Sequence, residues 1–242
     1  MTNASPAPSA FRAAARSALL ALLVAPLAAA ELDLASYLRL DGTQLDLRGA
    51  PVTDSDLASL HKPEFSSVHT VLLARTEITN AALGHLRSLQ VGRLDLFRTQ
   101  ISDDGLKWLR SLPLRHLVLT GTRITDDGLQ ELASSCVELL ELSDTSISRR
   151  GLTHLAGLPI RRLDLSYCAL QDEDLAPLRN FSKLAALDLS FTRISNGALT
   201  VLQEVTGLKE LYLLGIEISG KPLEEFRAAR PDVKVYTGWP TR

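Results

Sequence analysis

Short stretches of the chain alternate hydrophobic and polar residues as LxL, and after each stretch leucines recur at helical spacing. The period of two predicts a strand, whereas the LxxL spacing places its leucines on one face of a helix. In "LVLTGTRITDDGL", residues 117–129, a short polar segment separates the two patterns. Almost the same phrase, "LDLFRTQISDDGL", occupies residues 94–106. A strand, a turn and a short helix therefore form one unit that the sequence repeats.

The first hydrophobic residue of each LxL pair recurs every 23 or 24 residues, after one longer first interval of 26. These positions are Leu45, Val71, Leu94, Leu117, Leu140, Leu163, Leu187 and Leu211. A single unit cannot bury its own leucine face, whereas stacked units form a continuous core. The spacing therefore predicts eight stacked units over residues 45–226.

A small residue and then an aliphatic residue follow each LxL pair. The small-residue positions are Ala50, Thr76, Thr99, Thr122, Thr145, Cys168, Thr192 and Ile216. With this pattern, LxxLxLxxTxI, residues 32–236 resemble the leucine-rich repeat family, in particular its helix-bearing subgroups similar to ribonuclease inhibitor and to bacterial repeats reading TxI[ST]DxGL. The family usually has Asn or Cys at the small position, and a Thr hydroxyl or a thiol can still reach a main-chain group of the turn.

The resemblance implies an α/β fold, a curved leucine-rich repeat solenoid with parallel strands on its concave face and short helices on its convex face. Between the strand and the helix sits "SD" or "TD", as at Ser102 and Thr125. We expect the hydroxyl to cap a helix amide and the acids to interact with the positive end of the helix dipole. The glycine of "DDGL" lowers helix propensity, so helices of two to three turns are expected.

The two ends of the chain differ from the repeats. Arg12 and Arg16 precede the uncharged run "SALLALLVAPLAAA", residues 17–30, which has the layout of a secretory signal peptide. The run is too short and too interrupted by proline for a membrane span of about 20 apolar residues. We therefore predict a signal peptide over residues 1–30, an N-terminal cap over 31–44 and a C-terminal cap strand and tail over 227–242. Secretion or a periplasmic location follows; a bacterial effector leader is the alternative.

Composition narrows the class of partner. The 242 residues are 45% hydrophobic and 22% charged, which is ordinary for a soluble chain that buries a core. The formal net charge is −2, and from Glu31 onward it becomes −4, because 24 basic residues face 28 acidic ones. A nucleic-acid partner normally requires a basic stripe, so we expect none.

Strand alternation places a varied row of residues on the solvent side of the concave sheet. Between the paired leucines lie Asp46, Leu72, Asp95, Val118, Glu141, Asp164, Asp188 and Tyr212. Aromatic side chains beside arginine are typical of protein interfaces. The predicted binding surface comprises Arg93, Phe97, Arg98, Arg162, Tyr167, Asp188, Phe191, Glu210 and Tyr212, with Tyr167, Phe191 and Tyr212 as one exposed patch. For Asp95, Asp164, Arg93 and Arg162, simple pairing across strands is the favoured alternative.

Neither the histidines nor the cysteines predict chemistry. His85 and His154 occupy the same helical position and are expected to be solvated on the convex side. His116 can face Asp95 or Glu141, but no nucleophile is spaced to be activated by it. Cys136 and Cys168 are expected to be buried thiols rather than a disulfide. We predict no catalytic residue, no metal ligand set and no cofactor.

These observations predict a non-catalytic, monomeric module that binds a protein on its concave face. A glycan is an alternative ligand, and no membrane span is expected after signal cleavage. Two other interpretations stay open: an exported bacterial effector that acts on a host protein, and an envelope scaffold whose convex helices make the contacts.

Overall fold

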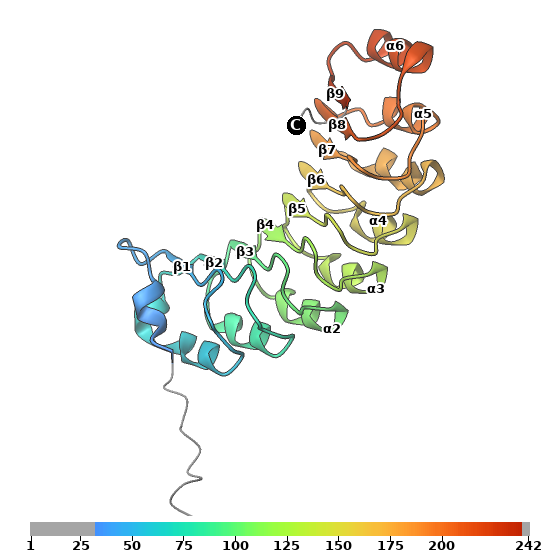
Figure 1. The fold of residues 1–242 in the computed structure, drawn as a ribbon. Coiled ribbons are helices and arrows are strands. Elements are labelled where there is room, and N and C mark those ends of the chain that lie inside the picture. Colours follow the sequence, from blue (N-terminus) through green and yellow to red (C-terminus); the bar gives the residue numbers. More distant parts are fainter. Residues whose placement is uncertain (1–31, 239–242) are drawn as a thin grey trace, which may run out of the picture. The chain divides into compact units, whose positions relative to one another are not determined.

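The computed structural model describes residues 32–238, and from Leu34 onward they form one compact unit. Its single parallel sheet keeps the strands in chain order. The strands are β1 (Gln44–Asp46), β2 (Thr70–Leu72), β3 (Arg93–Asp95), β4 (His116–Val118), β5 (Leu139–Glu141), β6 (Arg162–Asp164), β7 (Ala186–Asp188), β8 (Glu210–Leu214) and β9 (Lys234–Gly238). In this unit the strands follow the concave side and the helices the convex side, so the predicted solenoid is confirmed (Figure 1).

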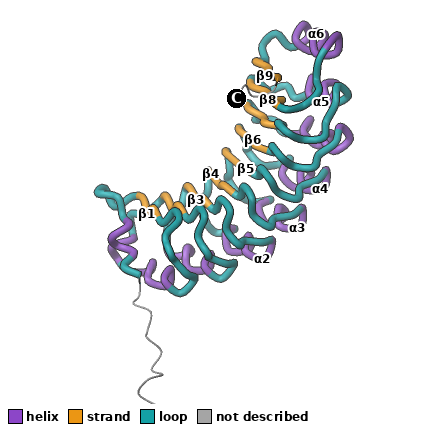
Figure 2. Tube along the Cα trace, viewed as in Figure 1, coloured by secondary structure: helices purple, strands orange, loops and turns teal. Residues whose placement is uncertain are grey.

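The convex side is built from short helices joined by long loops (Figure 2). The α-helices are α2 (Asp103–Leu106), α3 (Asp126–Leu129), α4 (Arg149–Leu155), α5 (Ala198–Gln203) and α6 (Gly220–Ala229). The 3₁₀ helices are η1 (Leu34–Tyr37), η2 (Asp56–His61), η3 (Pro63–Phe65), η4 (Ala82–Ser88), η5 (Lys107–Leu109), η6 (Gln130–Leu132) and η7 (Asp172–Asn180). Because α2 continues directly into η5 and α3 into η6, the helical segment of each unit has six to ten residues, in agreement with the predicted two to three turns.

The core is the stack of leucines that the period predicts. Leu45 pairs with Val71, Val71 with Leu94 and Leu94 with Leu117, so the first leucine of each LxL pair keeps one register through the sheet. The second leucine of each pair, such as Leu119, is also fully buried. Burying a leucine contributes about 1.5 to 3 kcal/mol, so the repeated leucine column is the main source of stability.

The small-residue column ties each turn to its own strand. The hydroxyl of Thr122 donates to the carbonyl of Leu119 at 2.5 Å, and Thr76, Thr99, Thr145 and Thr192 do the same in their own units. Cys168 donates instead to the carbonyl of Leu142, in the preceding unit, at 3.3 Å. The prediction that these residues reach a main-chain group is confirmed.

A second column, where the helices begin, connects several of the units to their next neighbour. Asp103 accepts from the amide of Thr125 at 2.8 Å and from its hydroxyl at 2.6 Å. The same pair of bonds joins Asp54 to Thr79, Asp126 to Ser148 and Asp172 to Ser195. We call this set of bonds the helix-start ladder. The capping role predicted for the hydroxyl holds at Thr125 and Ser148 but not at Ser102, and the principal role of the acid is this link between units.

The glycine of the "DDGL" phrase makes room for this ladder. A side chain at Gly128 would collide with the Asp103 carboxylate, and one at Gly105 would lie 2.6 Å from Asn80 Oδ1. The cost of glycine to helix propensity, about 1 kcal/mol, is therefore offset by close contact between neighbouring units.

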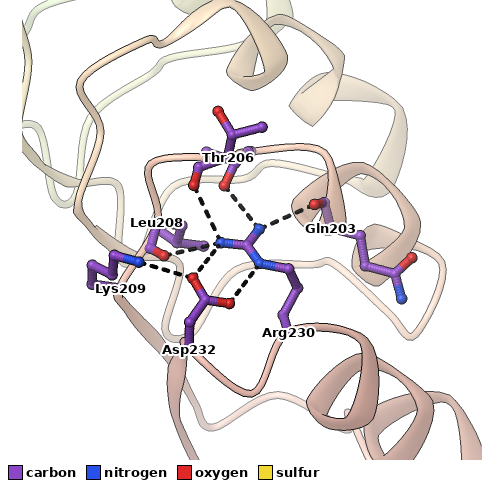
Figure 3. Close-up of polar contacts among 7 residues, drawn as sticks. Gln203, Thr206, Leu208, Lys209, Arg230 and Asp232 are labelled. Carbon is purple, nitrogen blue, oxygen red and sulfur yellow. Dashed lines mark hydrogen bonds and ion pairs between the residues drawn. The ribbon is translucent and has the colours of Figure 1, made fainter.

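The C-terminal end is closed by β9 and by the side chain of Arg230, drawn in Figure 3. The predicted strand at residues 231–236 is present, shifted to Lys234–Gly238 and paired with β8. The Arg230 guanidinium donates to the main-chain carbonyls of Gln203, Val205, Thr206 and Leu208. It also bonds Asp232, and hydrogen bonds from Arg230 and Lys209 hold the pKa of Asp232 well below its usual value of 3.8. This cluster fixes the last turn of the solenoid.

Two expectations about single side chains are wrong. Cys168 is buried as predicted, but Cys136 is exposed, because it lies in the loop between η6 and β5. His85 is exposed as predicted, whereas His154 is half-buried, since α4 contacts η6 and η7 on either side. Its Nε2 atom is buried without a hydrogen-bond partner in the described part of the chain.

The predicted signal peptide lies outside the described residues. Within residues 32–238, no helix is long and apolar enough to cross a membrane.

Candidate functional site

The concave sheet face is the candidate site, and its middle row is less uniformly exposed than alternation predicts. Asp46, Asp95, Asp164, Asp188 and Tyr212 are half-buried. Leu72 and Val118, predicted to face solvent, are only 6% exposed. These two apolar residues therefore belong to the floor of the face.

The aspartates of this row accept a hydrogen bond from their own strand ends. Asp164 Oδ1 accepts from the amide of Ser166 at 2.9 Å, and Asp188 Oδ1 accepts from the amide of Ser190 at 2.8 Å. Asp95 does the same for Phe97 at 3.0 Å. Each carboxylate satisfies a main-chain donor with one oxygen, a role for which hydropathy patterns give no signal.

Ion pairing on the face is sparser than the pairing hypothesis expects. Arg162 reaches Glu210 at 3.4 Å, and His116 Nε2 lies 3.0 Å from Glu141 Oε1, one of the two acids predicted to face it. Within residues 32–238, Arg93 and the three acids Asp95, Asp164 and Asp188 have no ion-pair partner. The simple pairing of acids with arginines is therefore wrong for three of the four residues to which it was applied.

A hollow of about 800 Å³ lies over the N-terminal strands, and its charges balance. Three acids line it, Asp46, Asp95 and Glu141, together with three bases, Arg48, Arg75 and Arg93. Phe97 also lines it, and the guanidinium groups of Arg75 and Arg98 lie 5.4 and 5.2 Å from the centre of its ring. The two arginines and the ring therefore already interact with each other through cation–π contacts.

A second hollow, of about 380 Å³, lies over β5 to β8 and is acidic. Glu141, Asp164 and Asp188 line it with one base, Arg162. Burial raises the pKa of Asp164 above its usual value of 3.8, and the charges of Asp188 and Glu141 add to that effect against the hydrogen bonds from Ser166. We call this region the acidic hollow.

A column of left-handed backbone conformations borders the sheet, three positions after the end of each strand from β1 to β7 and directly after β8. Glycine occupies it at Gly49, Gly121 and Gly215, but Arg75, Arg98, Asp144, Tyr167 and Phe191 also have φ between 51° and 59°. The recurrence of glycine at this position is the sequence signal that could have identified the column.

The rings of Tyr167 and Phe191 stack with centroids 4.6 Å apart and planes 12° from parallel. Tyr167 is 59% exposed, whereas Phe191 is half-buried against the Gly215 backbone. Tyr212 stacks instead on Tyr236, also at 4.6 Å. The predicted single exposed patch is therefore two stacked pairs, and the contribution of Tyr236 was missed because it depends on the register of the last strand.

Charged residues of the predicted surface lie beside only part of the aromatic patch. Glu210 accepts hydrogen bonds from Tyr212 at 3.2 Å and from Arg162 at 3.4 Å, and Asp188 is the register partner of Tyr212. In the described part of the chain, no group of three or more His, Cys, Asp or Glu side chains is arranged to hold a metal ion. The face thus offers rings, carboxylates and arginines to a ligand.

Comparisons with known proteins agree with this architecture. A family model described as leucine-rich repeat matches residues 110–133 and 159–178. Among solved structures, internalin C2 from Listeria monocytogenes is similar, with 25% identity and a TM-score of 0.61, over 81% of this chain and 80% of that one.

The internalin InlF from the same species is 22% identical, with a TM-score of 0.55 over 78% of this chain, and the match spans 50% of that relative's length. A sequence search of curated proteins finds no match. The repeated units, the parallel solenoid and these similarities identify the chain as a leucine-rich repeat protein, and thus in general as a protein-interaction module.

Proposed function

We propose that this solenoid binds a protein partner on its concave sheet face, without catalysis, and that the stacked rings of Tyr167 and Phe191 anchor that partner. The observation that carries the proposal is an exposed aromatic ring on a left-handed backbone position. The remainder of the predicted surface, including Arg93, Phe97 and Arg98, surrounds this anchor in the proposal.

The backbone conformation of Tyr167 opposes stability. A left-handed conformation costs a non-glycine residue roughly 1 to 2 kcal/mol, and glycine holds the same position at Gly121 and Gly215 without that cost. The ring of Tyr167 then remains 59% exposed, so burial offsets little of the cost. Strained residues of this kind cluster at binding sites, and exposed aromatic surface is typical of contacts with other molecules.

Replacing Tyr167 with glycine tests the proposal directly. The Tyr167→Gly variant removes the ring and relieves the backbone, so its melting temperature should equal or exceed that of the wild type. Capture of the partner, measured by photo-crosslinking in extracts of the source organism, should fall about tenfold or more, because aromatic anchors commonly contribute roughly 2 kcal/mol.

The matched control is Gln130→Ala, an exposed position in η6 on the helix side. It should capture the partner as the wild type does. Undiminished capture by Tyr167→Gly, together with loss in Gln130→Ala, would place the working surface on the convex side.

The proposal includes export of the mature unit, which the signal-like leader of residues 1–30 supports. N-terminal sequencing of the purified mature protein should give a start at Glu31. An intact Met1 would contradict export by signal cleavage and favour the effector alternative.

A further inference from the structure

We infer that the acidic hollow receives a basic side chain, arginine or lysine, from an extended segment of the protein partner. This inference rests on the proposed function and specifies the chemistry of its ligand. The hollow is part of a sheet face that no other part of the described chain covers, and its charge selects the occupant.

The hollow exists because one row of the sheet contains a small residue. Ala186 lies in register between Arg162 on one neighbouring strand and Glu210 on the other. These two long side chains meet above it at 3.4 Å. Ala186 and Arg162 both line the hollow of about 380 Å³, and the small alanine side chain fills little of it.

A row of carboxylates lines the hollow. Glu141, Asp164 and Asp188 occupy directly paired positions on three adjacent strands. Parallel strands lie about 4.8 Å apart, so these like charges repel one another. Within residues 32–238 neither Asp164 nor Asp188 has an ion-pair partner. One oxygen of each accepts a hydrogen bond from the main-chain amide two residues later. Glu141 contacts His116 and Arg162 pairs with Glu210, so the carboxylates of Asp164 and Asp188 are the two in the hollow that lack an ion-pair partner among residues 32–238.

An aromatic surface adjoins this row of carboxylates. Tyr212 is the register partner of Asp188, and its ring stacks on Tyr236 one strand further. An arginine or lysine side chain has an apolar stem and a charged head, so it can lay the stem against a ring while the head meets carboxylates. The order of carboxylates and rings along the face fits such a side chain.

Two observations favour an organic cation over other ligands. No group of three or more acids, histidines or cysteines in residues 32–238 is arranged to hold a metal ion. The N-terminal hollow has the same position relative to its strands, yet its three acids are balanced by three arginines. Of these two hollows, only the acidic hollow is complementary in charge to a basic segment.

The probe is a capped peptide of glycine and serine with two adjacent arginines, compared with the same peptide carrying citrulline, the uncharged counterpart of arginine. Binding is followed by amide chemical shifts at two salt concentrations. The test variant is Asp164→Asn with Asp188→Asn, because asparagine keeps the oxygen that accepts from Ser166 and Ser190 while removing the charge. The matched control is Asp46→Asn with Asp95→Asn in the balanced hollow.

The arginine peptide should bind the wild type about tenfold more tightly than the citrulline peptide, since hydrogen bonds to charged groups contribute about 1.5 kcal/mol or more. The test variant should abolish that difference and the control variant should keep it. Equal binding of the two peptides, no binding of either, or undiminished preference in the test variant would overturn the inference. Equal loss in both variants would also overturn it, because the peptide would then be attracted by the overall negative charge of the protein rather than by the acidic hollow.

Two variants distinguish a failure of this inference from a failure of the proposed function. If Tyr167→Gly loses the natural partner while the Asp164→Asn, Asp188→Asn variant captures it normally, the sheet face binds but the acidic hollow does not. If both variants capture the partner normally, the proposed function itself is contradicted.

Discussion

Two columns of acidic residues run along this solenoid, one where the helices begin and one along the middle of the sheet face. In the first, Asp103 and Asp126 each accept two hydrogen bonds from the next unit. In the second, Asp164 and Asp188 use one oxygen for their own strand end and have no ion-pair partner within residues 32–238. The same residue type therefore stabilises the fold in one column and leaves charge on the surface in the other.

The difference teaches which departures from the repeat are informative. A carboxylate whose partners recur from unit to unit, as at Asp54, Asp103, Asp126 and Asp172, is explained by the solenoid alone. A carboxylate that lacks such partners, and whose pKa is raised by burial as at Asp164, is not explained by stability. We therefore expect substitutions in the helix-start ladder to change the free energy of unfolding, and substitutions on the sheet face to change binding.

The largest effect should come from a substitution in the leucine core, which supports both columns of acidic residues. Leu119→Asp places a charge in the fully buried leucine stack. We expect a loss of about 4 kcal/mol or more in the free energy of unfolding, measured by urea denaturation. A denaturation curve like that of the wild type would contradict the inward position of Leu119.

The next effect should come from the ladder. Asp103→Ala removes the acceptor of the amide and the hydroxyl of Thr125, and we expect a loss of about 2 kcal/mol in the free energy of unfolding. The control is Asp104→Ala, an exposed neighbour in the same helix, which should change stability by less than about 0.5 kcal/mol. Equal effects of the two substitutions would mean that helix-end electrostatics, not the ladder, explains the acid.

A smaller effect is expected from the small-residue column. Thr122→Val keeps the shape of the side chain but removes the hydroxyl that donates to Leu119, so stability should fall by about 1 kcal/mol. The same substitution at the exposed Thr200 serves as the control. If Thr122→Val is as stable as the wild type, the threonine column contributes only packing.

The smallest effect has the opposite sign and lies on the sheet face. The pKa of Asp164 is raised in the folded state, so the folded state holds this proton more tightly and loses stability as pH rises above 3.8 through the raised value. Asp164→Asn should therefore be slightly more stable than the wild type at pH 7 and equally stable well below pH 3.8.

Asp46 provides the contrast for that measurement. The side-chain hydrogen bond from Arg48 lowers the pKa of Asp46, so its contribution to stability is present above pH 3.8 and is lost as pH falls. Asp46→Asn should destabilise the protein at pH 7, and this gap should close in acid. A stabilising Asp46→Asn would mean that the two hollows do not differ in charge balance.

The register of the strands, the leucine core and the sides occupied by strands and helices could be predicted because each repeats with the period of the chain. The partners of Asp103 could not, because a bond to a residue 22 positions later depends on how the coils stack. The stacking of Tyr212 on Tyr236 was missed for a similar reason, since Tyr236 lies in the last strand. Tyr167 was correctly placed at a strand end, but its left-handed backbone has no signature in hydropathy.

The helix-start ladder also determines which units of this chain are interchangeable. A second copy of residues 102–124, inserted after Ile124, would present Ser102 to the first Asp103 and a new Asp103 to Thr125. Every joint would then be complete. The unit that begins at Ser148 has Arg149 in place of the acid, and Asp174 of the following unit reaches back to the Arg149 amide at 3.3 Å. Duplicating that unit would leave two joints without the acid, so the solenoid can be lengthened at the unit that begins at Ser102 more readily than at the unit that begins at Ser148.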